Sequence, residues 1–155
     1  MSLHIIKNVK LEESQNLVNM IYYNFENLAE YEELMHNKAE IRRLVTDPHS
    51  KIIFILVNNR IAAYLVGEIK DLNDGRRVFY ISYIYTAEKF RKQGFASQLL
   101  KYVETITKKF KYDGIMLTND VEDEDVHNFY LMRGFMPDLI LRRYNKFDVL
   151  FKPIN

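Results

Sequence analysis

Much of the fold of this chain follows from one short stretch, in which a basic, glycine-containing loop joins an apolar strand to an amphipathic helix. Residues 79–83 are typical of a buried strand, and apolar residues recur at helical spacing from Ala96 to Phe110. Arg91, Lys92 and Gly94 lie between the two. A helix N-terminus carries unpaired backbone N–H groups and partial positive charge, which the basic side chains reinforce. The sequence therefore predicts an anion site at this loop, suited to a pyrophosphate.

Length and composition favour one domain. The chain has 155 residues and 48% of them are apolar, so we expect a single domain over residues 1–155. No apolar run approaches the ~20 residues that cross a bilayer, and the first four residues lack the basic-then-apolar form of a signal peptide. We therefore expect a cytoplasmic protein. Cysteine is absent, which excludes disulfides, thiolate metal ligands and a cysteine nucleophile.

The charge balance excludes some classes of partner. With 22 basic and 21 acidic residues the formal net charge is +1, which gives the chain no electrostatic reason to bind nucleic acid or an anionic membrane. The histidines are scattered, without the His-Glu-x-x-His spacing of a zinc site: His4, His36, His49 and His127. The sequence therefore predicts no metal site.

The remaining elements follow from periodicity and turn residues. Strands are predicted over residues 4–9, 51–57, 60–69, 77–85 and 115–118, the last parallel to the strand before it. Helices are predicted over residues 11–23, 26–45 with a break near residues 36–37, 97–110 and 124–133. Asn58-Asn59 indicates a hairpin, and a closing hairpin is expected with arms at residues 139–144 and 147–152.

A second motif lies about forty residues after the loop. In Asn128-Phe129-Tyr130-Leu131-Met132-Arg133-Gly134-Phe135, a short helix that carries a tyrosine ends at a glycine. Together the two motifs resemble the GNAT superfamily, the Gcn5-related N-acetyltransferases, over residues 78–135, whereas residues 1–77 fit only in the order of their elements. The resemblance implies an α+β single-domain fold, with a mixed, mostly antiparallel central sheet flanked by helices in the order β-α-α-β-β-β-α-β-α-β-β.

The resemblance also implies acetyl-CoA as the cofactor. In the family, the backbone of the strand before the loop pairs with the pantetheine arm, which would assign Ile84 and Tyr85 to that role, although core packing is the alternative. Ala96 stands where the motif often has glycine. The residues implied to contact the cofactor are Ile84, Tyr85, Arg91, Lys92, Gln93, Gly94, Phe95, Ala96, Ser97 and Asn128.

Tyr130 matches the family's helix tyrosine, whose hydroxyl can donate a proton to the CoA sulfur. A thiol titrates near ~8.5 and tyrosine near ~10, so this donation needs no strongly perturbed site. The alternative is an aromatic side chain that packs beside Val126 and Phe129. The resemblance therefore implies a catalytic role for Tyr130.

The base that deprotonates the amine is less well defined. Some family members carry a glutamate on the central strand, but here that strand offers Tyr80, Ser82 and Tyr83 and no carboxylate. Glu68, late in the preceding strand, is the candidate catalytic base, and Glu26 and Glu30 are alternatives.

The acceptor also stays open at this point. The acidic run at residues 120–125 is either a solvated loop that ends in a helix N-cap or part of an acceptor groove, which would favour a small cationic amine. Asp123 stands where relatives often carry an asparagine near the cofactor. A protein N-terminus or a lysine side chain is the alternative acceptor, and a non-catalytic acyl-CoA-binding module is the alternative of another class. The closing hairpin allows a homodimer.

Overall fold

The computed structural model of the chain describes residues 2–6 and 9–154. The chain forms two compact units, which we call the first unit (residues 1–68 and 83–99) and the second unit (residues 69–82 and 100–155). The described part of the chain contains no helix long and apolar enough to cross a membrane.

The first unit contains an antiparallel run of three strands. Strand β1 (Ser2–Ile6) pairs with β2 (Ser50–Val57), and β2 pairs with β3 (Arg60–Asp71), which continues into the second unit. Asn58 and Asn59 connect β2 to β3 with positive φ angles of 51° and 63°, as a type I′ hairpin turn requires. The predicted hairpin is therefore confirmed. The predicted first strand overlaps β1, although its residues 7 and 8 lie outside the described residues.

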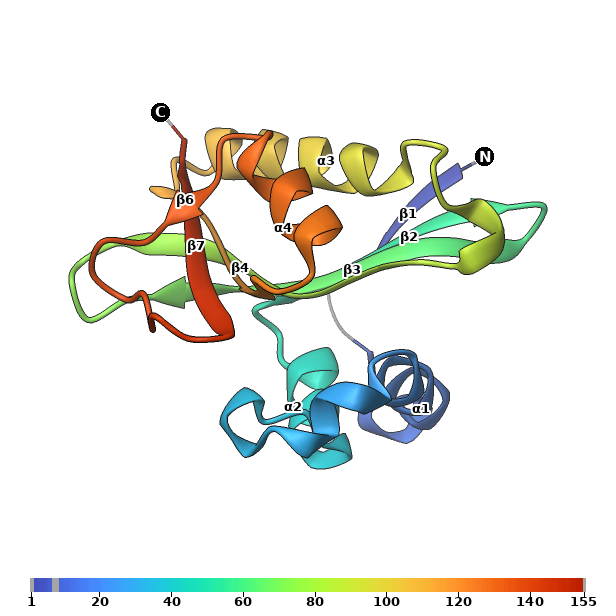
Figure 1. The fold of residues 1–155 in the computed structure, drawn as a ribbon. Coiled ribbons are helices and arrows are strands. Elements are labelled where there is room, and N and C mark those ends of the chain that lie inside the picture. Colours follow the sequence, from blue (N-terminus) through green and yellow to red (C-terminus); the bar gives the residue numbers. More distant parts are fainter. Residues whose placement is uncertain (1, 7–8, 155) are drawn as a thin grey trace. The chain divides into compact units, whose positions relative to one another are not determined.

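Helices follow β1 and pack with β2 and β3 (Figure 1). The helical elements are η1 (Leu11–Glu13), α1 (Gln15–Asn24), η2 (Glu26–Glu30), η3 (Glu32–Leu34) and α2 (Lys38–Thr46). The predicted break is confirmed, since Met35 has a φ of 52° and the Asn37 side chain caps α2 by accepting the N–H of Glu40 at 2.8 Å. Residues 26–34 form two 3₁₀ segments rather than an α-helix. One cluster of buried core residues in this unit consists of Val18, Ile21, Ile41, Leu44, Val45, Ile52, Tyr64 and Val66.

The second unit is built on a strand-helix-strand crossover. Strand β4 (Arg77–Thr86) and helix α3 (Phe95–Lys109) each pass from one unit into the other, and β5 (Gly114–Asp120) pairs in parallel with the start of β4. Helix α4 (Glu124–Leu131) follows β5. Strand β7 (Phe147–Pro153) then pairs antiparallel with β5 on one edge and with the short β6 (Met136–Pro137) on the other. The predicted parallel strand is therefore confirmed.

The strand order β1-β2-β3-β4-β5-β7-β6 gives one seven-stranded sheet. Every pairing described here is antiparallel except that of β4 with β5. The predicted fold class, a mixed and mostly antiparallel sheet flanked by helices, is therefore confirmed.

The predicted strand over residues 139–144 is wrong. The Asp138 carboxylate accepts the backbone N–H of Leu141 at 2.9 Å, and the Asp148 carboxylate accepts that of Arg143 at 2.6 Å. These side chains therefore use backbone donors that a strand ladder would need. The segment is an irregular loop with Leu139 almost fully exposed, and its place in the hairpin is taken by β6.

Candidate functional site: the cofactor loop and helix α4

The predicted anion loop lies in the first unit, between β4 and α3. The short helix η4 (Glu88–Phe90) leads into it, and the chain then adopts positive φ angles at Lys92 (63°) and Gly94 (84°). Helix α3 begins at Phe95, and the carbonyl of Gly94 accepts the first helical hydrogen bond from Gln98 N–H at 3.0 Å. A helix N-terminus carries backbone N–H groups without partners in the helix, together with partial positive charge. The loop therefore has the backbone form of an anion-binding turn at a helix N-terminus.

The loop is open where a ligand would approach. Arg91, Lys92, Gln93 and Gly94 are exposed, while Phe95 is buried and packs on Phe90 with 6.3 Å between ring centroids. A Cβ built on Gly94 would meet no atom within 4 Å, so the space beside this backbone is free. The residues present therefore fit a pyrophosphate group, with the buried Phe95 anchoring the loop beneath it.

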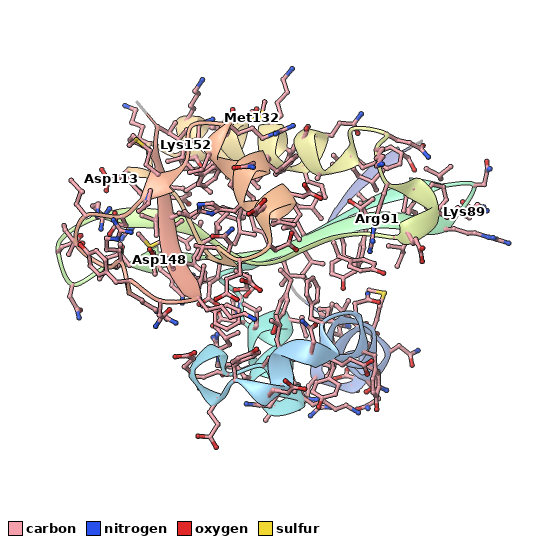
Figure 2. All side chains as sticks on the ribbon, viewed as in Figure 1. Lys89, Arg91, Asp113, Met132, Asp148 and Lys152 are labelled. Atoms are coloured by element: carbon pink, nitrogen blue, oxygen red, sulfur yellow. The ribbon has the colours of Figure 1, made fainter. Side chains whose placement is uncertain are left out.

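Arg91 also ties the loop to β4. Its Nε donates to the carbonyl of Thr86 at 3.0 Å, and its guanidinium lies 5.9 Å from the ring centroid of Tyr85. Figure 2 shows Arg91 on the segment between β4 and α3, with Lys89 near it on η4. The positive charge of Arg91 is therefore held in a defined place beside the loop.

Ile84 and Tyr85 lie on β4, and both side chains are half-buried. The Tyr85 ring contacts Phe25 at 5.8 Å and Tyr64 at 5.5 Å between centroids. Core packing is thus a real role of Tyr85. It involves the side chain and not the backbone, which is the part that the resemblance assigns to the pantetheine arm.

Tyr130 lies in the second unit at the end of α4, 5% exposed, with its ring centroid 5.4 Å from Phe129 and 5.5 Å from Phe135. The helix ends in a Schellman motif: Phe135 N–H donates to the Tyr130 carbonyl at 3.2 Å, and Gly134 N–H to that of Leu131 at 3.2 Å. Gly134 has the left-handed φ of 92° that this motif needs. The tyrosine-glycine spacing in the sequence thus fixes the backbone that carries Tyr130.

Burial raises the pKa of the Tyr130 hydroxyl above the ordinary tyrosine value of 10.0. The phenol therefore remains protonated at neutral pH, as a proton donor must. Within the described residues, its hydroxyl has no hydrogen-bond partner, which leaves the O–H available to a bound group.

The acidic run before α4 is largely exposed to solvent and ends in an N-cap. The Asp123 carboxylate accepts the N–H of Val126 at 3.4 Å, while Glu122 and Glu124 are exposed. Asn128, predicted to contact the cofactor, is exposed on the same helix. His127 Nδ1 lies 3.3 Å from the side-chain amide of Asn119.

Glu68, the predicted base, is 8% exposed on β3. One carboxylate oxygen lies 3.3 Å from the guanidinium of Arg43, which also pairs with Glu40 at 2.8 Å. Glu26 and Glu30, the alternatives, are exposed on η2.

The sequence prediction missed a contact between a buried histidine and a tyrosine. His36 is 5% exposed between η3 and α2, and its Nδ1 lies 2.8 Å from the hydroxyl of Tyr83 on β4. These residues are 47 positions apart, so no local spacing could have linked them. A histidine in a turn is ordinarily expected to be exposed, and that expectation would have argued against a buried contact of His36 with Tyr83.

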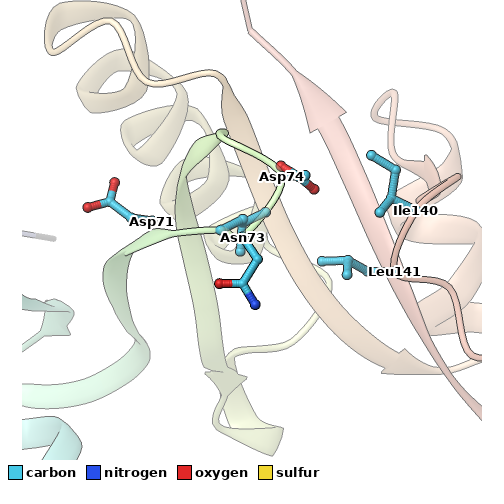
Figure 3. Close-up of a pocket in the computed structure, with 6 residues that line it drawn as sticks. Asp71, Asn73, Asp74, Ile140 and Leu141 are labelled. Atoms are coloured by element: carbon cyan, nitrogen blue, oxygen red, sulfur yellow. The ribbon is translucent and has the colours of Figure 1, made fainter.

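A groove of about 530 Å³ lies in the second unit between the turn after β3 and the loop before β7 (Figure 3). Its carboxylates are paired with arginines, Asp71 with Arg77 at 2.6 Å and Asp74 with Arg76 at 2.8 Å. The lining residues are Asp71, Leu72, Asn73, Asp74, Ile140 and Leu141, and none of them is a predicted site residue.

Comparisons with known proteins agree with this fold. The model of the acetyltransferase (GNAT) family matches residues 12–135. A search of curated proteins gives no match. Among solved structures, Arabidopsis thaliana NAA60 in complex with acetyl-CoA is 12% identical, with a TM-score of 0.71 over 99% of each chain. The PaiA N-acetyltransferase from Thermoplasma acidophilum in complex with coenzyme A is 14% identical, with a TM-score of 0.66 over 99% of each chain. A chain of the NatC complex bound to Gag peptide and CoA is 19% identical, with a TM-score of 0.60 over 100% of each chain.

Proposed function

Because the chain belongs to the GNAT acetyltransferase family, we propose that it is an N-acetyltransferase that moves an acetyl group from acetyl-CoA to a primary amine. The amine attacks directly in a ternary complex, without a covalent enzyme intermediate. The observation that carries this proposal is the open, left-handed turn at Gly94, at the N-terminus of α3, with Arg91 and Lys92 beside it.

The cofactor would be held by the loop at residues 91–97, chiefly through backbone N–H groups, and by the backbone of Ile84 and Tyr85. The free space beside Gly94 supports this assignment, as do the similar structures that contain acetyl-CoA or CoA. When bound, acetyl-CoA supplies the activated thioester. The chain's own residues supply its position and the proton transfers.

Tyr130 is the proposed proton donor to the departing sulfur. Its hydroxyl supports this role, because it is protonated at neutral pH and the described residues offer it no partner. The Schellman motif at Gly134 holds the tyrosine rigidly enough to place one O–H.

The acceptor that we propose first is a small cationic amine. The exposed carboxylates of Glu122, Glu124 and Asp125 at the start of α4 supply the negative charge that would attract it. A protein N-terminus or lysine is the second candidate, which the likeness to a NatC chain solved with a peptide favours.

The proposal is tested by following acetyl-CoA-dependent thiol release with a thiol reagent, across polyamines, aminoglycosides, amino acids and short peptides. The protein has no cysteine and adds no background. Release with one class of acceptor would support the enzyme and choose its substrate class. Silence across the panel while CoA still binds would favour a non-catalytic acyl-CoA-binding module.

A further inference from the structure

His36 lies in a buried aromatic setting that fixes its tautomer. Its Nε2 is 3.0 Å from the backbone carbonyl of Tyr22, which can only accept a hydrogen bond, so Nε2 carries the proton in the neutral ring. Its Nδ1 is therefore an acceptor, and the Tyr83 hydroxyl, 2.8 Å away, donates to it. The neutral imidazole thus presents a basic nitrogen to a tyrosine hydroxyl.

The surroundings hold this arrangement. The His36 ring stacks on Tyr22 with 5.1 Å between centroids and an interplanar angle of 4°, and Phe25 contacts both His36 and Tyr83. Two charged side chains nearby lie on α2: Lys38, with its Nζ 5.4 Å from the centroid of the Tyr22 ring, and Glu40. Burial, and to a smaller extent the Glu40 carboxylate, raises the pKa of Tyr83, so its hydroxyl is protonated at neutral pH.

Tyr83 lies on β4, next to the residues that the resemblance assigns to the cofactor arm. It directly precedes Ile84 and Tyr85, and the same strand leads to the loop at residues 91–97. A cofactor with its pyrophosphate at the loop and its arm along Tyr85 and Ile84 would present its reactive end toward Tyr83. We propose that Tyr83 and His36 form a proton relay that takes the proton from the acceptor amine. This inference rests on the proposed N-acetyltransferase function.

The relay balances its protons. The acceptor's ammonium N–H bond breaks and its proton passes to the Tyr83 oxygen, while the Tyr83 proton passes to His36 Nδ1. The tyrosine ends neutral, and the amine nitrogen gains the lone pair that attacks the acetyl carbon. As the amide forms, the nitrogen loses a second proton, which offsets the one that Tyr130 gives to the sulfur. The charge rests on His36, where both ring N–H groups have acceptors, the Tyr22 carbonyl and the Tyr83 oxygen. Release of that proton to solvent after product departure resets the relay.

The relay explains how the acceptor amine loses its proton better than Glu68 does. The Glu68 carboxylate already accepts a hydrogen bond from the Arg43 guanidinium at 3.3 Å, so one of its oxygens is engaged. Tyr83 is half-buried, so part of its surface still reaches solvent, and the basic nitrogen behind it has no cationic partner among the described residues.

The test uses the full chain and the amine that the thiol-release panel selects. Tyr83→Phe and His36→Gln are compared with wild type and with Tyr112→Phe, a control in the turn before β5. The readouts are kcat/KM for the amine from pH 6.5 to 9.5, acetyl-CoA affinity, and thermal unfolding. Amines titrate near ~10, so without a base only the neutral fraction, about 1 in 1,000 at pH 7, reacts.

We expect both variants to lose about 100-fold or more in kcat/KM at pH 7, with acetyl-CoA affinity and the control unchanged. The deficit should shrink steeply as pH rises toward the amine pKa, which a packing defect would not produce. A Tyr83→Phe or His36→Gln variant with wild-type rate and profile, or with a deficit independent of pH, would overturn the relay and leave the transferase intact. A wild type that releases no thiol would overturn both.

A second measurement needs no variant. Long-range ¹H–¹⁵N NMR spectra of the wild-type protein report the tautomer of each of its four histidines. The relay requires His36 to carry its neutral-state proton on Nε2. A proton on Nδ1 would overturn it even if the variants fail to fold.

Discussion

The backbone N–H of Phe135 donates to the carbonyl of Tyr130 at 3.2 Å, which closes α4 on the residue proposed to protonate the departing sulfur. The same bond makes Gly134 adopt its φ of 92°. One local motif thus links the stability of the helix end to the placement of the Tyr130 ring.

Tyr130→Phe should lower kcat about 100-fold or more, because it removes the proton donor and keeps the ring that packs on Phe129 and Phe135. The acetyl-CoA affinity should stay the same. Steady-state kinetics together with direct cofactor titration separate these effects. Full turnover by the variant would remove Tyr130 from the mechanism.

Gly134→Ala should destabilise the fold by about 1–2 kcal/mol, since alanine is strained at positive φ. The space is also tight, because the new Cβ would lie 3.3 Å from Cε of Lys152. Urea unfolding measures the change. The matched control is Gly75→Ala, which has a similar φ of 98° but no atom within 4 Å of its Cβ, so its loss should be the smaller one. Equal losses would mean that the Lys152 contact is unimportant.

Lys92→Ala should weaken acetyl-CoA binding about tenfold at low salt, because its charge lies at the loop proposed to hold the pyrophosphate. Added salt should reduce the difference in acetyl-CoA affinity between Lys92→Ala and wild type. The control variant is Lys89→Ala, on the neighbouring η4. Binding of a pantetheine fragment without the pyrophosphate should not change. A fragment that loses as much affinity as the whole cofactor would contradict the assignment of this loop.

Asp138→Asn should cost about 2 kcal/mol of stability at pH 7, because the buried carboxylate accepts from the Arg76 guanidinium at 2.7 Å and from Leu141 N–H. The Arg76 side chain lowers the pKa of Asp138 in the folded protein. A lowered folded pKa stabilises above the unfolded value near ~3.9, and this stabilisation is lost as pH falls through the folded pKa.

The stability difference between wild type and Asp138→Asn should therefore be full at neutral pH and disappear in acid. Denaturant unfolding at a series of pH values tests this. Asp71→Asn, which breaks an exposed pair with Arg77, should change stability little at any pH. A difference for Asp138→Asn that persists into strong acid would contradict the ion-pair account.

Local signals in the sequence predicted the elements whose geometry is decided locally. Asn58-Asn59 tolerates the positive φ angles of its turn, and Gly134 ends α4 as expected. The segment at residues 139–144 looked like a strand because its apolar residues favour one. The competing hydrogen bonds come from Asp138 and Asp148, whose effect depends on tertiary placement.

In the candidate site, too, local sequence predicted some features, whereas others depend on tertiary placement. The loop at residues 91–97 and the tyrosine of α4 could be located from motifs, because each is a contiguous piece of chain. The contact between His36 and Tyr83 brings together the segment before α2 and strand β4. Periodicity carries no information on such a pair, and only the folded first unit reveals it.

The most direct test of acetyl transfer follows thiol and acetylated product together in one reaction of the wild-type protein with acetyl-CoA and an amine. We predict that thiol appears only when the amine is present, with one acetylated amine formed per thiol and no acetyl group on the protein. Thiol release without the amine, or an acetylated protein chain, would contradict direct transfer in a ternary complex.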